Sequence, residues 1–253
     1  MKTYQRVPVY NMSMKIKHKT YFVGATLPEM LIVLMISMLI VSILVSLLMM
    51  VYQYRQQQQQ QLQLQNQVHK ALQLMSKDLR RAGYHAAKRE NNLALFQIEG
   101  KSIQLNQEKS GYFQCVMFFY DLNMDGCIGS QRKNQACIEN GRNSSTKLNE
   151  ELFGYRYGNN NIEMLFMDKN SFDEKCSTDE CQRHLNNPNC TAKRWYKLLP
   201  ESYVVETLKF NWLAEKKGIQ ITLKVYLNEQ KQIAYQATAL VPLLNEVQNA
   251  ALP

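Results

Sequence analysis

Three oxygen-bearing side chains alternate along one short segment, Asp121-Leu-Asn-Met-Asp-Gly126. Oxygens at alternate positions before a glycine are typical of the first half of a calcium loop, because the glycine permits the sharp turn that lets the ligands converge. The glutamate that usually completes such a loop is missing, and Arg132 stands in its place. Two interpretations stay open: a calcium site at Asp121, Asn123 and Asp125, or a turn rich in Asx residues between strands.

The chain also has six cysteines, which could form disulfides or bind a metal: Cys115, Cys127, Cys137, Cys176, Cys181 and Cys190. All six follow the apolar run of residues 30–52. If the leader before that run is cytoplasmic, the cysteines face an oxidising compartment, where an even count predicts disulfides. We expect Cys127 to pair with Cys137, which closes a short loop, and the other pairs stay open. The alternative is a zinc site of Cys176, Cys181, His184 and Cys190, whose spacing matches no common zinc pattern.

Motifs for other chemistry are absent from the sequence. It has no glycine-rich phosphate loop, no nucleophile elbow and no metalloprotease helix. The neighbouring carboxylates Glu150 and Glu151 have no special context, and we expect them at the surface. The chain is therefore not expected to be an enzyme or to require a cofactor, and calcium is the one candidate ligand.

The apolar run of residues 30–52 sets the topology. These residues carry no charge, and at about 1.5 Å per residue they can cross a hydrocarbon core of about 30 Å. Five basic residues and no acid precede Gly24, and positive charge holds its side of a span in the cytoplasm. Subtracting these five charges from the net charge of +9 leaves +4. The basic composition is thus mostly a topology signal.

The segment before this run is Gly24-Ala-Thr-Leu-Pro-Glu29. An ordinary secretory signal places its cleavage site after the apolar core, whereas Gly24 lies before it, so cleavage there would leave the span attached to the product. Glu29 is an ionisable group at the edge of a membrane helix, which makes it a functional hypothesis with a partner to be found. The plain alternative is a carboxylate that reaches the headgroups. Pro28 is tolerated in a first helical turn.

This order of residues resembles the class III signal of type IV pilins and type II secretion pseudopilins. The resemblance implies that the prepilin peptidase cuts the Gly24–Ala25 bond on the cytoplasmic side. It also implies N-methylation of Ala25, where the family usually has phenylalanine, and pairing of Glu29 with the N-terminal amine of a neighbouring subunit. Since the leader is longer than is usual in this family, Met12 and Met14 are alternative starts.

Residues 29–82 contain neither glycine nor proline and are dominated by good helix formers. We therefore predict one helix of about 80 Å that leaves the membrane and continues. Its second half is amphipathic and needs a domain to cover it, because apolar residues recur at spacings of four, three and four: Val68, Leu72, Met75 and Leu79. The segment Met75-Ser-Lys-Asp-Leu-Arg-Arg-Ala-Gly-Tyr84 is similar to the end of this helix in W-type minor pilins, J-type minor pseudopilins and the prepilin peptidase-dependent protein B group.

After Gly83 the pattern alternates as in strands. We expect strands at residues 95–99, 102–106, 112–120, 151–157, 161–167, 203–213, 218–227 and 232–241, and loops in the cysteine-rich inserts 121–146 and 168–200. A long helix packed on an antiparallel sheet is economical, so we expect an α+β fold with disulfide-stapled loops. This arrangement is also the pilin-like fold that the resemblance implies. The expected domains are a cleaved basic leader (1–24), a transmembrane and assembly helix (25–52), its amphipathic continuation (53–83) and a β-rich head (84–253).

Together these features predict a single-pass protein of the inner membrane of a Gram-negative envelope, with its head in the periplasm, that is then packed into a pilus or pseudopilus. As a minor subunit it would prime assembly or lie near the tip. Its expected partners are other minor pilins or pseudopilins, the major subunit and the prepilin peptidase. The sequence does not separate a type IV pilus from a type II secretion pseudopilus.

The alternative function is a tip-located binding module for DNA, a surface or a secreted substrate. Basic residues near Trp195 and Tyr196 could grip a single strand by stacking and cation contacts, and these are Arg132, Lys133, Lys193, Arg194 and Lys197. A solvated basic loop is the plain interpretation of the same residues.

Overall fold

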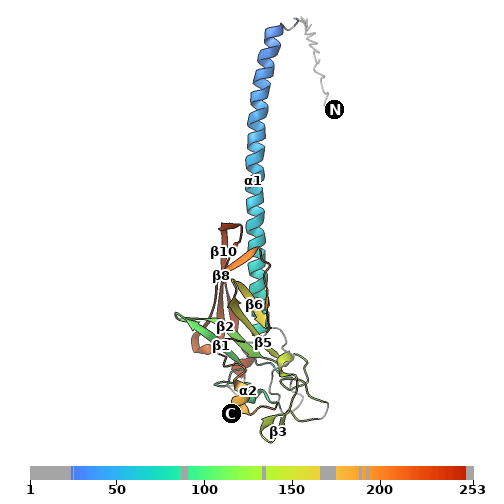
Figure 1. Ribbon diagram of the computed structural model, residues 1–253, viewed down its shortest axis with the longest axis vertical. Coiled ribbons are helices and arrows are strands. Elements are labelled where there is room, and N and C mark those ends of the chain that lie inside the picture. Colours follow the sequence, from blue (N-terminus) through green and yellow to red (C-terminus); the bar gives the residue numbers. More distant parts are fainter. Residues whose placement is uncertain are drawn as a thin grey trace, which may run out of the picture. The chain divides into compact units, whose positions relative to one another are not determined.

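The computed structural model describes Gly24 and residues 26–86, 91–132, 135–165, 175–187, 190–191 and 194–248. The chain forms two compact units, residues 1–54 and 55–253. The elements (Figure 1) are α1 (Leu27–Leu79), η1 (Leu93–Phe96), β1 (Ile103–Lys109), β2 (Tyr112–Phe119), β3 (Ile138–Glu139), β4 (Arg142–Asn143), η2 (Leu148–Glu150), β5 (Leu152–Gly158), β6 (Asn161–Leu165), α2 (Thr178–Gln182), β7 (Trp195–Lys197), β8 (Tyr203–Trp212), η3 (Ala214–Lys216), β9 (Gly218–Leu227), β10 (Gln230–Pro242) and α3 (Leu244–Gln248).

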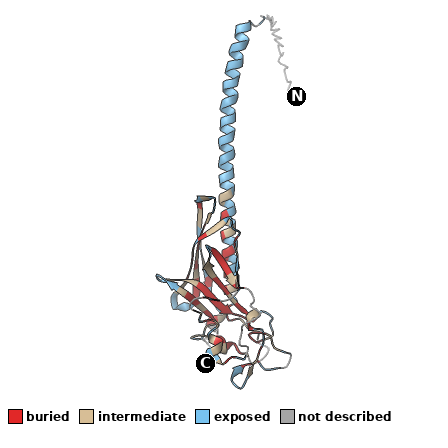
Figure 2. Ribbon diagram, viewed as in Figure 1, coloured by how far each residue is buried: buried red, intermediate tan, exposed pale blue. Residues whose placement is uncertain are grey.

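The first unit consists, in its described part, of the beginning of α1. Residues 27–54 are exposed on every side of the helix (Figure 2). By length and composition, α1 is the one helix of the described residues that could cross a membrane. An apolar helix with no protein covering it needs lipid or other helices around it, since soluble proteins rarely leave large apolar patches uncovered.

In the second unit, α1 carries the predicted apolar stripe. Its buried residues are Leu64, Val68, Ala71, Leu72, Met75 and Leu79, which confirms the face expected from the periodicity. The helix continues through the glutamine run of residues 56–61 without a break. Asp78 on the same helix accepts a hydrogen bond from the hydroxyl of Tyr155 on β5, which adds one polar tie between helix and sheet.

The sheet is antiparallel, with the strand order β10-β9-β8-β2-β5-β6-β7 and β1 paired to β2. Most expected strands are confirmed, including the meander of β8, β9 and β10. The β5–β6 turn also agrees, because Asn159 and Asn160 both have positive φ, 50° and 55°, as a two-residue type I′ turn requires. β3 and β4 form a separate two-stranded sheet within an insert that was expected to be a loop.

The strand expected at residues 95–99 is wrong. Residues 93–96 form the 3-10 helix η1, and only Ile98 makes an isolated bridge, to Lys101. Leu93 and Phe96, three residues apart, are both buried, and this spacing suits a 3-10 turn, in which residues i and i+3 share a face. The tight turn at Glu99 and Gly100, both with positive φ, then leads the chain back into β1.

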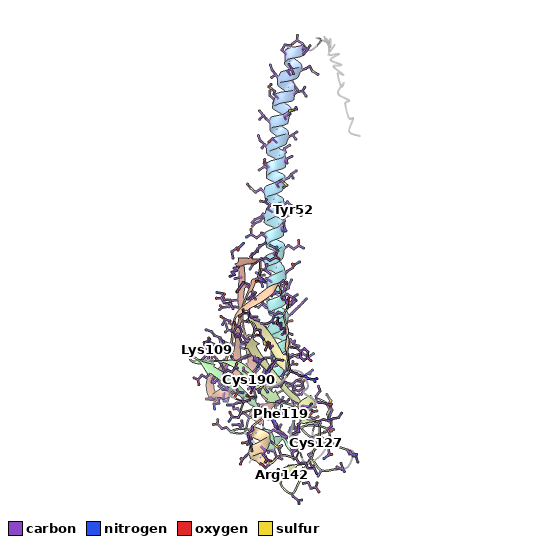
Figure 3. All side chains as sticks on the ribbon, viewed as in Figure 1. Tyr52, Lys109, Phe119, Cys127, Arg142 and Cys190 are labelled. Carbon is purple, nitrogen blue, oxygen red and sulfur yellow. A yellow bond between two sulfur atoms is a disulfide. The ribbon has the colours of Figure 1, made fainter. Side chains whose placement is uncertain are left out.

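The sheet separates two cores. The first lies between the sheet and α1, and the second lies on the other face, with η1 and two of the disulfides. β2 contributes to both, because its side chains alternate: Val116 and Phe118 belong to the first core, and Cys115, Met117 and Phe119 to the second. This is why its last five residues are all buried, although the sheet is antiparallel. Phe119 is labelled in Figure 3.

The segment that contains α3 packs at the C-terminal end of α1 and forms hydrogen bonds there. The Asn245 side-chain amide donates to the carbonyls of Arg80 and Ala82, at 3.1 and 3.2 Å, so it caps groups that a helix end leaves unpaired. Glu246 is buried, and its Oε1 accepts the Ser102 N–H at 2.9 Å. A Cβ at Gly83, whose φ is +74°, would lie 2.6 Å from that oxygen. A larger residue here would be strained by the positive φ, and the Glu246 carboxyl group would have to move.

The buried Glu246 predicts a stability that falls as the pH rises. Burial raises the pKa of Glu246 to about 7, and hydrogen bonding to Ser102 and the charge of Lys101 only partly oppose this. The folded state thus retains its proton between the ordinary pKa of 4.5 and about 7. The stabilisation is complete below pH 4.5 and is lost as the pH rises through 7, by roughly 3 kcal/mol.

We expect Glu246→Gln to remove that part of the pH dependence. The amide oxygen still accepts the Ser102 N–H but cannot ionise. Urea unfolding of the full chain in detergent, followed by tryptophan fluorescence at pH 5 and pH 8, measures the effect. Glu229→Gln, at an exposed position, is the control and should keep the slope of the parent chain. An unchanged slope in Glu246→Gln would contradict the assignment.

Candidate functional site

The site predicted from the sequence at the N-terminus of α1 is described from Gly24 and from Thr26 onward, and Ala25 lies outside the described residues. Gly24 is exposed, and a Cβ there would meet nothing within 4 Å. Helix α1 begins at Leu27, and the N–H of Met30 donates to the Thr26 carbonyl at 3.2 Å. Cleavage of the Gly24–Ala25 bond stays a prediction.

Glu29 caps its own helix. Its Oε2 accepts the backbone N–H of Thr26 at 2.9 Å and the Thr26 hydroxyl at 3.0 Å. A carboxylate at the third helical position that reaches back to the N-cap N–H is one half of a capping box, and the helix dipole favours negative charge at this end. The sequence analysis did not foresee this local role, although the spacing Thr-x-x-Glu is its usual signature.

The capping leaves the charge of Glu29 without a counter-charge. Within the described residues, Glu29 makes no ion pair, and the two groups that donate to it, the N–H and the hydroxyl of Thr26, are neutral. The carboxylate lies at the edge of an exposed apolar helix, where lipid would surround it. A cation from another molecule could therefore replace or join the Thr26 hydrogen bonds.

All six cysteines are paired. Cys127 bonds to Cys137, the pair that the short loop favours, and the other pairs are Cys115–Cys190 and Cys176–Cys181. The zinc alternative therefore fails, since three of its four candidate ligands are held in disulfides. Among the described residues, no three His, Cys, Asp or Glu side chains gather where they could hold a metal ion.

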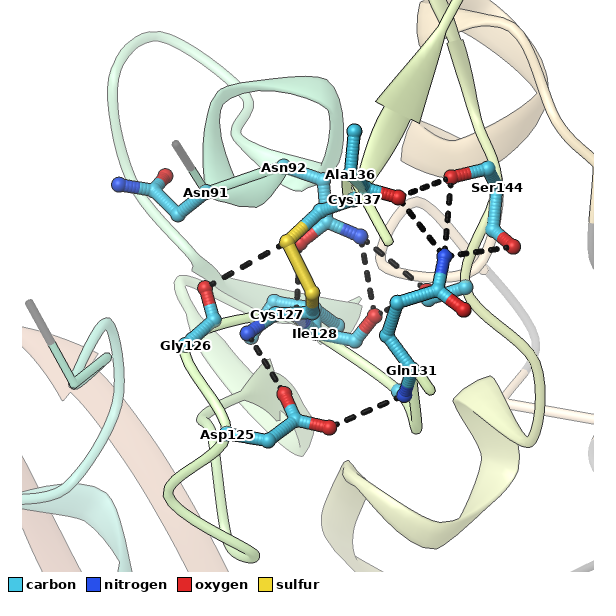
Figure 4. The surroundings of a disulfide bond; sticks show 12 residues. Asn91, Asn92, Asp125, Gly126, Cys127, Ile128, Gln131, Ala136, Cys137 and Ser144 are labelled. Carbon is cyan, nitrogen blue, oxygen red and sulfur yellow. Dashed lines mark hydrogen bonds between the residues drawn. A yellow bond between two sulfur atoms is a disulfide. The ribbon is translucent and has the colours of Figure 1, made fainter. Parts of the chain in front are cut away.

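The Cys127–Cys137 disulfide lies in a loop tied by side-chain amides (Figure 4). The Gln131 amide donates to the carbonyls of Ala136 and Ser144, at 2.8 and 3.2 Å. Beneath the loop, the buried Asn92 accepts the Ile128 N–H through its Oδ1 at 2.6 Å. The disulfide and these bonds hold a segment that has almost no regular secondary structure.

The oxygens of the candidate calcium loop cap backbone N–H groups. Asp121 Oδ2 accepts from Ala86 and Gly126, at 3.0 and 2.9 Å. Asn123 Oδ1 accepts the Asp125 N–H at 2.8 Å, and Asp125 Oδ1 accepts the Cys127 N–H at 2.8 Å. The bonds of Asn123 and Asp125, each to the N–H two residues on, are those of Asx turns, so the geometry favours the second of the two interpretations. Calcium binding at this loop stays a prediction.

Glu151 was expected at the surface and is buried, with a relative exposure of 1%. Its two oxygens accept the backbone N–H groups of Leu122, Asn123 and Gly129, at 2.8 to 3.1 Å. Burial raises its pKa to about 8, the three N–H groups oppose this rise, and the nearby Asp121 adds to it. Glu151 thus joins both ends of the Asp121 loop to the start of β5. Sequence reasoning missed it because no local signal marks a carboxylate that binds a distant loop.

The basic residues proposed to grip a nucleic acid do not form one described surface. Lys133 and Lys193 lie outside the described residues, and Lys197 pairs with Glu201 at 3.5 Å. Trp195 is half-buried: its Nε1 donates to the Cys190 carbonyl at 3.1 Å, and the Arg156 guanidinium lies 4.5 Å from its ring centre. Since Trp195 already stacks on an internal arginine, it does not offer an open platform for a base.

Comparisons with known proteins give a family match. The family model described as prepilin peptidase-dependent protein B matches residues 57–243. A protein of Haemophilus influenzae, described as uncharacterized, is 37% identical over 188 residues, which covers 71% of this chain and 79% of that protein. No solved structure matches the chain. The matched region comprises the second half of α1 and the head, and the N-terminal segment lies outside it.

Proposed function

Because the chain belongs to the prepilin peptidase-dependent protein B family, we propose that it is a minor pilin or pseudopilin that is cut after Gly24 and packed through α1 into a pilus or pseudopilus. It would first reside in the inner membrane, with the head in the periplasm. Its role is structural rather than enzymatic, and its partners are the prepilin peptidase, other minor subunits and the major subunit.

The observation that carries this proposal is the exposed apolar length of α1. Residues 27–54 are exposed all round, and none of them is buried by other described residues. Lipid can cover the apolar surface of such a helix first, and the helices of neighbouring subunits can cover it afterwards, because both are apolar surroundings. A polymer subunit needs this exchange, whereas a simple membrane anchor does not.

We propose that Glu29 sets the axial register between the α1 helices of neighbouring subunits. In the described residues its charge has no counter-charge, and it lies four residues after the proposed new terminus, Ala25, along the sequence. Pairing with the N-terminal amine of a neighbouring subunit would compensate the charge and fix the axial offset between two helices. The capping bonds to Thr26 keep the carboxylate ordered until that amine arrives.

A position near the tip fits the head better than a position in the shaft. The shaft of a filament repeats one packing many times, so its subunits must be compact. This head instead carries long inserts, residues 121–146 and 168–200, stapled in part by Cys127–Cys137 and Cys176–Cys181. We therefore propose that the subunit starts assembly or remains near the tip.

Mass spectrometry of the mature N-terminus tests the processing. The full chain is expressed with and without the prepilin peptidase. We expect the protein from cells with the peptidase to begin at Ala25 and to carry one methyl group, and the protein from cells without it to keep its leader. Gly24→Leu should block the cut, because the peptidase reads that glycine. A mature terminus elsewhere, or one that does not depend on the peptidase, would overturn the proposal.

A further inference from the structure

Strand β10 is a long edge strand. With 13 residues it is the longest strand of the described chain, and it lies at the end of the strand order, where its partner is β9. The other end of that order is β7, which has three residues and includes a lysine. Natural sheets usually keep edges short or charged, because an open edge pairs with other chains.

On the edge of β10 that faces away from β9, the backbone N–H and C=O groups pair with no other described strand. Leu243 donates to the Lys217 carbonyl at 3.0 Å, so residue 243 faces β9. The register between β10 and β9 is regular from Ala234 to Pro242, and alternate residues face the same neighbour. The even-numbered residues therefore face outward, and the Ala234 carbonyl indeed accepts a bond from Gln61 of α1, at 3.4 Å. The outward N–H groups are those of Gln236, Thr238 and Leu240.

This edge lacks the usual charged protection. Residues 232–244 contain no charged side chain, and the side chain of Leu240 is 61% exposed. Protection is confined to the two ends of the strand: Lys231 and the irregular register between Gln230 and Ala234 at the start, and Pro242 at the end. An uncharged, regular edge of this length is a surface on which another strand can add.

A groove of about 470 Å³ runs along this edge, between α1 and β10. Figure 1 shows β10 beside the lower, teal part of α1. The α1 wall includes His69, Lys77 and Arg80, the β10 wall is formed by residues 238–240, and the lining contains no acid. Contacts close both ends: His69 bonds to the Tyr235 hydroxyl at 2.9 Å, and Asn245 bonds to the Arg80 carbonyl at 3.1 Å.

We propose that this groove binds an extended acidic segment of another protein, which adds to β10 as a further strand. The outward N–H and C=O groups of residues 236–240 would supply the strand hydrogen bonds. Lys77 and Arg80 would bind carboxylates on the side of the added strand that faces α1. A strand that pairs with residues 236–240 would contribute about five residues, at roughly 3.4 Å each.

Charge decides between this occupant and a second copy of the chain. A symmetric pair formed edge to edge through β10 would bring two sets of Lys77 and Arg80 together, because a two-fold interface places the same patch on both sides. Like charges at such an interface oppose association. An acidic strand instead compensates both cations, so the groove favours a different polypeptide.

The test uses the full-length chain in detergent micelles and a fluorescent eight-residue peptide in which valine alternates with glutamate. Fluorescence anisotropy measures binding. One comparison peptide carries lysine in place of glutamate. Two others carry N-methyl groups on the backbone nitrogens, one at the odd-numbered positions and one at the even-numbered positions. We expect saturable binding of the glutamate peptide and at least ten-fold weaker binding of the lysine peptide. We also expect that one of the two N-methylated peptides does not bind, because its methyl groups replace the N–H groups that face β10.

Variants of the chain separate the two contributions. Lys77→Glu with Arg80→Glu should weaken binding at least ten-fold, whereas Lys70→Glu, on the same helix but outside the groove lining, should leave it unchanged. Leu240→Pro removes one outward N–H without breaking the ladder to β9 and should also weaken binding, whereas Leu240→Ala should not. Thermal unfolding of each variant checks that the head is folded.

Several results would overturn the proposal. One is the absence of saturable binding of the glutamate peptide at millimolar concentration. Another is equal binding of the glutamate and lysine peptides, and a third is binding that neither Leu240→Pro nor N-methylation affects. Binding of phosphatidylglycerol vesicles with the same dependence on Lys77 and Arg80, without peptide binding, would assign the groove to lipid instead. Self-association of the chain that Leu240→Pro abolishes would assign it to a second copy.

Discussion

Replacing Glu29 by leucine is expected to leave the protein in the membrane, cut at its leader, and to abolish its incorporation into the filament. The substitution removes the carboxylate that we assign to pairing with a neighbour's amine, and it makes the span uniformly apolar. A charge within an apolar span costs up to about 2.5 to 3.5 kcal/mol, so the leucine variant should be held in lipid at least as firmly as the parent chain. The filament then loses the subunit because nothing compensates the incoming amine.

Glu29→Gln separates this role from the capping that the structure shows. The amide oxygen of glutamine can still accept the Thr26 N–H that Glu29 accepts at 2.9 Å, but it carries no charge. If the charge sets the register, the glutamine variant fails as the leucine variant does. If only the cap matters, glutamine incorporates normally while leucine does not.

The measurement is the amount of subunit in sheared filaments relative to the membrane fraction, by immunoblot, together with the mature N-terminus of each variant. Thr26→Val is a matched control, because it removes the hydroxyl bond to Glu29 and retains the N–H bond. It should incorporate at a level close to that of the parent chain. Normal incorporation of Glu29→Leu would contradict the assignment of Glu29 to register.

The parts of the fold that follow a simple period could be predicted from the sequence. The stripe of Val68, Leu72, Met75 and Leu79 repeats with the period of a helix, and all four residues are buried. The meander of β8 to β10 alternates with the period of a strand and is punctuated by turn residues. In both cases the signal is local, so neighbouring residues decide it without knowledge of the rest of the chain.

The irregular parts depend on distant partners and could not be predicted. Strand β7 exists because residues 195–197 pair with β6, and Trp195 is held there by Arg156 and by the Cys190 carbonyl. Glu151 looked like a surface residue, yet three backbone N–H groups of another loop surround it. The Thr26–Glu29 cap differs from these, because its spacing is a local signature that the sequence analysis overlooked.

The Cys115–Cys190 disulfide is the covalent link that holds this irregular region. It joins β2, in the middle of the sheet, to the segment before β7, across a sequence separation of 75 residues. The carbonyl of Cys190 accepts from Arg156 at 2.8 Å, and Arg156 also pairs with the buried Glu163 at 2.7 Å. The disulfide therefore positions the backbone group on which a buried ion pair depends.

Replacing both Cys115 and Cys190 by alanine is expected to destabilise the head by about 4 kcal/mol, whereas the same change at Cys176 and Cys181 should cost about 2 kcal/mol. In the chain-entropy model the stabilisation grows with the closed loop, and the two sequence separations are 75 and 5 residues. All four cysteines are fully buried, so the comparison is matched for lost packing. The Arg156–Glu163 pair should add to the difference, because it loses the support of the Cys190 carbonyl.

Urea unfolding of the full chain in detergent measures both variants. The chain has two tryptophans, Trp195 and Trp212, and both belong to the head, so their fluorescence reports the head without interference from the exposed apolar half of α1. The Cys115/Cys190 variant should also change the Trp195 signal before global unfolding, because Trp195 donates to the Cys190 carbonyl. Equal destabilisation by the two double substitutions, with an unchanged Trp195 signal, would show that the link to β7 does not depend on this disulfide.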